Sequence, residues 1–231
     1  IPQESSLYPD ARLNMAFIYD KKDEKKKAED VLAKTIAIYP KSHELYITLA
    51  TLYEGDKNYD MALSTLLEGT ANIPENEAIL LRLGNIYDLM NKKEMGLIEV
   101  EKVLKMNPEN PDALNFIAYS LAEKNEKLKE AEKLAENAIK LKPDDAYIMD
   151  TLAWIYYKMK RYDAALKLLL KAVEKIADEP VILEHLGDVY SVLNNRNNAL
   201  KVLNRSLELY EDQDDIERVK EKVRKFIKHE N

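Results

Sequence analysis

The stretch AYIMDTLAWIYYKMKRYDAALKLLLKA, from Ala146 to Ala172, predicts two antiparallel helices joined by a short turn. Read with a helical period, its first half places one set of side chains on a single stripe: Met149, Leu152, Ala153 and Tyr156. Its second half does the same with Tyr162, Ala165, Leu168, Leu169 and Ala172. Ala153 and Ala165 are expected where the two helices cross, because only small side chains let two backbones approach closely.

The same pattern recurs along the chain at steps of 34 residues, the spacing at which Pro40, Pro74 and Pro108 follow one another. A small residue occupies the crossing position six times: Ala16, Ala50, Gly84, Ala118, Ala153 and Gly187. Tyr follows three residues later in every repeat except the fourth, which has Leu121. The fourth repeat also has one extra residue in its turn, between Lys124 and Lys127.

This recurrence predicts a lead-in at residues 1–8, six helical-hairpin repeats and a C-terminal capping helix at residues 214–231. The repeats are expected at residues 9–42, 43–76, 77–110, 111–145, 146–179 and 180–213. Ser42 and Asn110 are expected to be helix N-caps, and Asp214 with Asp215 is expected to cap the last helix.

The repeated unit resembles the tetratricopeptide repeat (TPR). Its pattern W-x2-L-G-x2-Y, then A-x3-F, is matched in form by Met149-x2-Leu152-Ala153-x2-Tyr156, then Ala165-x3-Leu169. The resemblance extends from Pro9 to His229, and the fourth to sixth repeats are similar to the final repeats of long bacterial members. It implies an all-α, right-handed superhelical solenoid whose first helices line a concave, ligand-binding surface.

Composition supports helices and excludes several functions. The chain has 231 residues, of which 33% are charged and only five are Gly. Its formal charge of −7 argues against nucleic-acid binding, so an RNA-binding helical repeat is the disfavoured third alternative. No apolar run approaches the roughly 20 residues of a membrane span, so this segment is not expected to insert into a membrane.

The compartment stays open at this stage. The chain has no Cys, which removes disulfides and thiolate chemistry and is compatible with both reducing and oxidising surroundings. A start at Ile1 in place of Met indicates a segment of a longer chain. The location therefore stays unknown, with two alternatives: cytoplasmic, or periplasmic if an exported precursor lies upstream of Ile1.

The sequence predicts no enzyme, no metal site and no cofactor. His43, His185 and His229 are far apart and form no ligand pair of the H-E-x-x-H kind. There is no glycine-rich phosphate loop. Paired carboxylates such as Asp144-Asp145 precede helices, where capping explains them.

The register that the resemblance implies assigns inward-facing positions on each first helix and predicts an acidic, partly aromatic groove. The candidate peptide-binding residues are Arg82, Asn85, Asn115, Tyr119, Asp150, Trp154, His185 and Asp188. Asn85, Tyr119, Trp154 and Asp188 hold the ninth position of successive repeats and should form a row that binds an extended peptide. In the alternative interpretation, Tyr119 and Trp154 only fill space between neighbouring first helices.

The expected partner is a protein or peptide with basic or apolar side chains. Family members that grip a C-terminal carboxylate need several cations at these inner positions, and the first three repeats offer only Arg82 there. We therefore predict no binding of an EEVD-type tail. The rival hypothesis is a structural spacer or a self-associating segment of a longer TPR protein, because the N-terminal end of the array is weakly capped.

Overall fold

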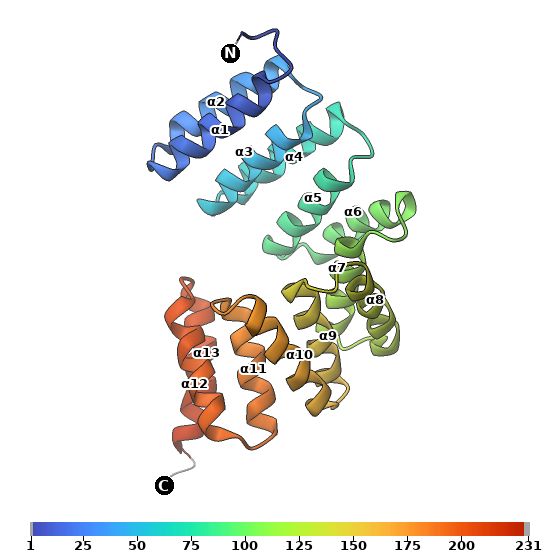
Figure 1. The fold of residues 1–231 in the computed structure, drawn as a ribbon, viewed down its shortest axis with the longest axis vertical. Coiled ribbons are helices and arrows are strands. Elements are labelled where there is room, and N and C mark those ends of the chain that lie inside the picture. Colours follow the sequence, from blue (N-terminus) through green and yellow to red (C-terminus); the bar gives the residue numbers. More distant parts are fainter. Residues whose placement is uncertain (1, 229–231) are drawn as a thin grey trace. The chain divides into compact units, whose positions relative to one another are not determined.

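The computed structural model describes residues 2–228, and within this range the regular structure consists of thirteen α-helices (Figure 1). The all-α prediction is therefore confirmed. The chain divides into two compact halves, at residues 1–108 and 109–231, which are described one at a time. Predictions that concern His229 and the two residues after it lie outside the described range, as does the side chain of Ile227.

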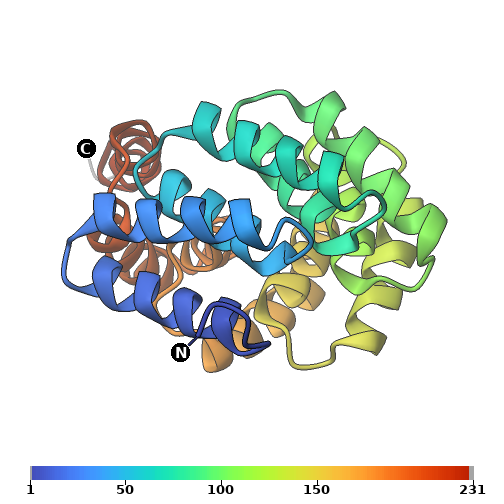
Figure 2. The ribbon, with the colours of Figure 1, turned by 90° about the horizontal axis from the view of Figure 1, so that it is seen from above.

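The N-terminal half contains α1 (Tyr8–Lys21), α2 (Lys25–Ile38), α3 (His43–Gly55), α4 (Tyr59–Asn72), α5 (Glu77–Leu89) and α6 (Lys93–Met106). Successive helices pack as the pairs α1–α2, α3–α4 and α5–α6, and each second helix also packs on the next first helix. The α1–α2 pair is seen in blue in Figure 2. This half is a stretch of an α-helical repeat solenoid.

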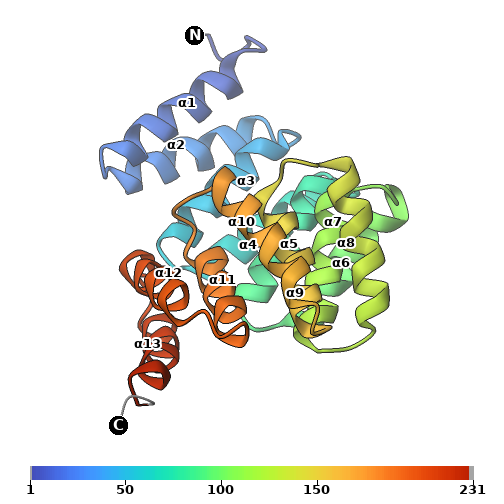
Figure 3. The same ribbon diagram turned by 60° about the horizontal axis from the view of Figure 1, so that its bottom comes forward.

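The C-terminal half contains α7 (Pro111–Glu123), α8 (Leu128–Leu141), α9 (Ala146–Lys158), α10 (Tyr162–Lys175), α11 (Pro180–Val192), α12 (Arg196–Leu209) and α13 (Gln213–Lys228). It repeats the same pairing, and α13 packs on α12, as Figure 3 shows. Arg218 and Lys222 of α13 follow Glu184 and Asp188 by 34 residues. The helix α13 therefore takes the place that the first helix of a further repeat would occupy.

Backbone hydrogen bonds complete the turn between the two helices of each pair. The residue after the first helix's last turn is left-handed in all six pairs: Asp23, Lys57, Asn91, Asn125, Lys160 and Asn194. The next N–H then donates to a carbonyl five residues back, as from Arg161 N to Tyr156 O at 2.8 Å. Leu121 accepts the same bond from Glu126 at 3.0 Å, so this closure does not need a Tyr side chain. The extra residue of the fourth repeat is accommodated by a second left-handed residue, Lys127, with φ 45°.

The N-cap predictions have mixed outcomes. Asn110 is confirmed as a cap, because its side-chain oxygen accepts from Ala113 N at 3.0 Å. Ser42 is confirmed as the N-cap residue of α3, but its side chain makes no capping bond, because its hydroxyl donates to Glu44 at 3.1 Å. The last helix begins one residue earlier than expected, so Asp212 accepts from Asp214 N at 3.0 Å, while Asp214 lies in the first turn.

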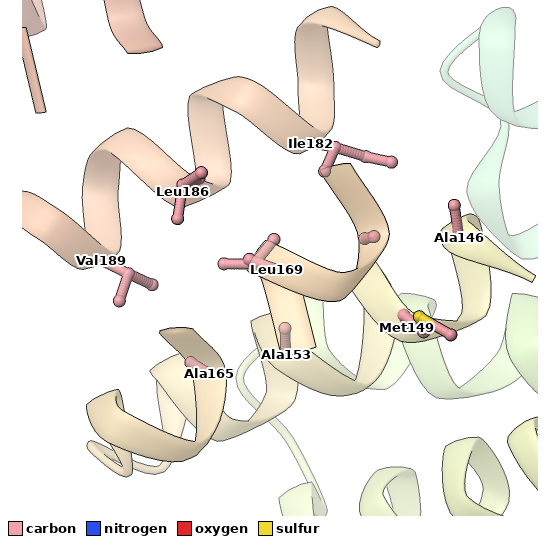
Figure 4. Packing of buried hydrophobic residues seen from close by; sticks show 9 residues of the cluster. Ala146, Met149, Ala153, Ala165, Leu169, Ile182, Leu186 and Val189 are labelled. Atoms are coloured by element: carbon pink, nitrogen blue, oxygen red, sulfur yellow. The ribbon is translucent and has the colours of Figure 1, made fainter. Parts of the chain in front are cut away.

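The packing confirms the role of small residues at the helix crossings. Ala153 and Ala165 are fully buried where α9 crosses α10 (Figure 4). From α10, Leu169 points toward Leu186 and Val189 of α11 and joins this pair to the next. Successive pairs therefore share a continuous core, and the inner side chains of α7, α9 and α11 are held at fixed spacing.

Candidate binding site

The predicted site residues are divided between the two halves. Arg82 and Asn85 lie on α5 in the N-terminal half, whereas the other six lie on α7, α9 and α11 of the C-terminal half. The row that includes Asn85 therefore stays a prediction. Within the C-terminal half, a cavity of about 410 Å³ brings Tyr119, Trp154, His185 and Asp188 together. We call this cavity the terminal pocket; it is lined by Tyr119, Glu123, Trp154, Val181, Glu184, His185, Asp188, Tyr210, Asp215, Arg218 and Lys222.

In the N-terminal half, Arg82 is used inside the protein. Its guanidinium donates to Thr51 Oγ1 at 3.0 Å and forms an ion pair with Glu54, both on the preceding first helix α3. Asn85 is exposed. On α7 in the other half, Asn115 is half-buried, and its Oδ1 is buried without a hydrogen-bond partner among the described residues.

Asp150 and His185 form a buried pair that links α9 to α11. The distances from His185 Nδ1 to the two carboxylate oxygens are 2.8 and 3.0 Å, and the residues are only 6% and 7% exposed. Burial by itself would lower the pKa of His185, but the Asp150 carboxylate outweighs it and raises that pKa above its ordinary value. In this arrangement both residues position neighbouring helices.

Trp154 connects three first helices. Its indole Nε1–H donates to Glu123 Oε1 on α7 at 2.7 Å, and its ring stacks on His185 of α11 with centroids 4.2 Å apart. On α9 itself, the ring stacks on Tyr157 and carries the Lys158 ammonium 4.6 Å from its centroid. Trp154 thus fills space between neighbouring helices, as the alternative interpretation held, and it also lines the terminal pocket.

The helix α13 supplies one wall of the terminal pocket. Glu184 of α11 accepts from Tyr210 at 2.8 Å, from Arg218 at 2.7 and 3.0 Å, and from Lys222 at 2.7 Å. Burial alone would raise the pKa of Glu184, but these donors outweigh it and lower the pKa to about 2. Lys222 also pairs with Asp188 at 2.5 Å.

Arg218 and Lys222 were not among the predicted site residues, because the segment from residue 214 was interpreted only as a capping helix; Tyr210, at the end of the sixth repeat, was not predicted either. The 34-residue register contains the missing signal. Continued by one step, it takes Glu184 to Arg218 and Asp188 to Lys222, which places both cations on the row of inner positions. The cap is therefore also a wall of the pocket.

Metal-binding groups and membrane-spanning helices are both absent from residues 2–228. Between residues 2 and 228, no three His, Asp or Glu side chains are grouped so that they could hold a metal ion. No helix in the same range has the length and apolar character needed to span a bilayer.

Comparisons with known proteins place this geometry in a family. Models described as tetratricopeptide repeat match residues 10–42, 78–110, 122–184 and 182–213, which together make up more than half of the chain. The chain belongs to the tetratricopeptide repeat family. Its structure is an α-helical repeat solenoid, as the resemblance implied.

Individual relatives agree with the TPR assignment. The chain is 31% identical over 119 residues to a TPR repeat-containing protein of Pseudomonas aeruginosa. That match covers 50% of this chain but only 20% of the relative, so the chain spans about a fifth of its length. The bacterial resemblance of the sequence is therefore matched by a bacterial relative.

Among solved structures, a chain of the APC/C hetero-tetramer Cut9–Hcn1 superposes with a TM-score of 0.76 at 17% identity, covering 94% of this chain and 44% of that one. The structure reported for pilF of Pseudomonas aeruginosa superposes with a TM-score of 0.68 at 16% identity, covering 93% and 97%. At these identities the similarity shows the TPR fold alone.

Proposed function

We propose that this TPR chain is a noncatalytic scaffold that holds a segment of a partner protein against the inner face of its first helices. TPR repeats generally mediate protein–protein interaction, and the family is generally noncatalytic. The observation that carries the finer proposal is the terminal pocket, a cavity of about 410 Å³ with Tyr119, Trp154 and Val181 in its lining. Its volume lies within the range of ligand pockets, and its lining combines these side chains with several charged ones such as Glu123 and Asp188.

The interior contacts support a pre-formed surface. Trp154 is fixed by Glu123 and His185, and His185 is fixed in turn by Asp150. Because these side chains are already ordered, a partner loses less conformational entropy from the scaffold when it binds. The pocket therefore suits a partner segment that inserts one or two side chains.

Photo-crosslinking tests this proposal. A photoreactive phenylalanine analogue replaces Tyr119 in the terminal pocket or, as the control, Ile98, an exposed apolar residue (54%) on the second helix α6. We expect partner crosslinks from position 119 that are lost in the Trp154→Ala background, and none of the same products from position 98. Equal products from both positions, or products that persist without Trp154, would contradict binding at the pocket.

A second candidate function, self-association, is favoured by the first helix. On α1, the consecutive residues Phe17 and Ile18 are 59% and 52% exposed, which gives this helix adjacent exposed apolar side chains. Light scattering over a range of protein concentrations tests this candidate. We expect any concentration-dependent mass to be abolished by Phe17→Ser with Ile18→Ser, and a constant monomer mass would exclude self-association through α1.

A further inference from the structure

The cations of the terminal pocket are already paired with carboxylates. Arg218 donates through Nε and Nη2 to Glu184 and through Nη1 to Asp215. Lys222 lies 2.7 Å from Glu184 and 2.5 Å from Asp188. Since His185 is bonded to Asp150, an acidic ligand would have to break an existing pair before it could bind a cation of the described lining.

The carboxylates differ from the cations because two of them keep acceptor capacity. A carboxylate has about four lone-pair sites on its two oxygens. Glu123 uses Oε1 for the Trp154 indole, and Asp188 uses Oδ2 for Lys222. Among residues 2–228 no hydrogen bond is made to the other oxygen of either carboxylate, so each keeps the capacity to accept from a new donor. The groups of the pocket that can still pair with a ligand are therefore the negatively charged carboxylates.

Asp188 is also incompletely compensated. Burial raises its pKa, and the nearby Glu184 carboxylate raises it further, so that the Lys222 ammonium does not bring the pKa back to its ordinary value. A carboxylate with a raised pKa is stabilised by any additional cation that approaches it. Tyr119, Trp154 and the 38% exposed Val181 supply apolar surface in the same pocket.

We propose that the terminal pocket takes a lysine or arginine side chain from a basic segment of the partner, with its charged end paired to Glu123 or Asp188. The aliphatic stem of that side chain lies against Tyr119, Trp154 and Val181, as long cationic side chains commonly do on apolar surface. A cavity of about 410 Å³ has room for such a side chain with its flanking backbone. This inference rests on the proposed scaffold function and specifies the chemistry of the partner.

Trp154 allows a direct test because it is the only Trp in the chain. Its fluorescence is titrated with capped heptapeptides that differ only in the central residue: lysine, arginine, norleucine or glutamate. We expect saturable changes with the lysine and arginine peptides, weakening with added salt, and at least tenfold weaker binding of the other two, since tenfold corresponds to about 1.4 kcal/mol. Tighter binding of the glutamate peptide, equal binding of the norleucine peptide, or no saturation with lysine would overturn the proposal.

Three substitutions locate the interaction. Glu123→Gln and Asp188→Asn each remove one charge and are expected to weaken the lysine peptide about tenfold. Glu174→Gln is the matched control, because Glu174 is an exposed carboxylate on α10 outside the pocket, and it should leave the affinity unchanged. Equal effects of all three variants would reduce the proposal to a general attraction between opposite net charges.

Lys222→Met is expected to raise the affinity for the lysine peptide, whereas a loss of folding would lower it. Without the Lys222 ammonium, Glu184 and Asp188 are less compensated, so the lysine peptide should bind at least threefold more tightly. An unchanged or weaker affinity, with the circular dichroism of the folded protein retained, would contradict the assigned chemistry. If position 119 still crosslinks to a partner while the peptides show no preference for a cation, the inference fails and the scaffold function survives; if both fail, so does the scaffold function.

Discussion

The substitution Gly187→Ala, which adds a single methyl group, is expected to lower the stability of the folded protein. A Cβ at this position would lie 2.5 Å from Leu203 Cδ2 and 2.6 Å from Leu203 Cγ. Leu203 is fully buried, so it cannot turn outward to make room. Overpacking of this kind costs about 1–3 kcal/mol, whereas replacing Gly by Ala inside a helix returns about 1 kcal/mol. For Gly187→Ala we expect a net loss of up to about 2 kcal/mol in the free energy of unfolding.

Two other glycines provide matched controls for Gly187→Ala. Gly55 has no atom within 4 Å of the added Cβ, so Gly55→Ala should stabilise by about 0.5–1 kcal/mol. At Gly69 the nearest atoms to the added Cβ, on Ile79 and Tyr46, lie at 3.1 Å. For Gly69→Ala the cost of this close contact and the gain in helix propensity should therefore nearly cancel. Urea unfolding followed by circular dichroism, and for the C-terminal half by Trp154 fluorescence, measures all three.

The clash itself is tested by removing the side chain that causes it. Leu203→Ala creates a cavity and destabilises by about 2–5 kcal/mol. In that background Gly187→Ala should become neutral or stabilising, because the added methyl group enters the vacated space. If Gly187→Ala destabilises equally with Leu203 present or absent, or if it matches Gly55→Ala, the reasoning from packing at this crossing is refuted.

Three further predictions concern turns and buried charges. Lys160 has φ 61°, a conformation that costs a residue other than Gly about 1–2 kcal/mol, so Lys160→Gly should raise the urea midpoint, and an unchanged midpoint would contradict this. The raised pKa of His185 makes its pair with Asp150 stabilising in full below the ordinary pKa of 6.5, and the contribution is lost as pH rises through the higher folded value. Urea midpoints from pH 6 to 9 should therefore fall more steeply for the wild type than for Asp150→Asn, and parallel curves would exclude the pair as the cause. The lowered pKa of Glu184 has the opposite consequence: its contribution is present above the ordinary value of 4.5 and is lost as pH falls towards about 2. With allowance for solvent screening at the pocket mouth, Glu184→Gln should lower the free energy of unfolding by about 2 kcal/mol at neutral pH. The variant should also lose less stability than the wild type as the pH falls below 4.5. An equal loss of stability in acid for variant and wild type would refute the assignment.

The helical hairpins could be predicted because their signals are local. Apolar spacing within a helix and small residues at the crossings, such as Ala153 and Gly187, follow from packing that repeats every 34 residues. Ser42 does hold the N-cap position of α3, but its hydroxyl bonds to Glu44 in place of a backbone N–H, because a hydroxyl has more than one local partner. Capping residues indicate a helix start without determining which hydrogen bond forms.

The charged contacts of the site were harder to predict. His185 and Asp150 were both assigned to the inner face, but their mutual bond depends on the side-chain conformations of two helices 35 residues apart in the chain. Arg218 and Lys222 fell within the predicted capping helix and were given no role there, since a charge pattern does not distinguish water from a carboxylate as the partner. A repeat register gives the order of side chains along the inner face, while hydrogen-bond geometry decides which of them remain open to a ligand.

Backbone closure of the hairpins has a consequence for protein engineering. Each tight bend between paired helices is completed by a main-chain N–H and a main-chain carbonyl, whichever side chains surround it. The additional residue near Lys127 lengthens one bend while Ala118 and Ala131, on the two helices that it joins, remain fully buried. Short epitope tags or fluorescent labels inserted at these bends should therefore leave the stacked helices and their inner face intact.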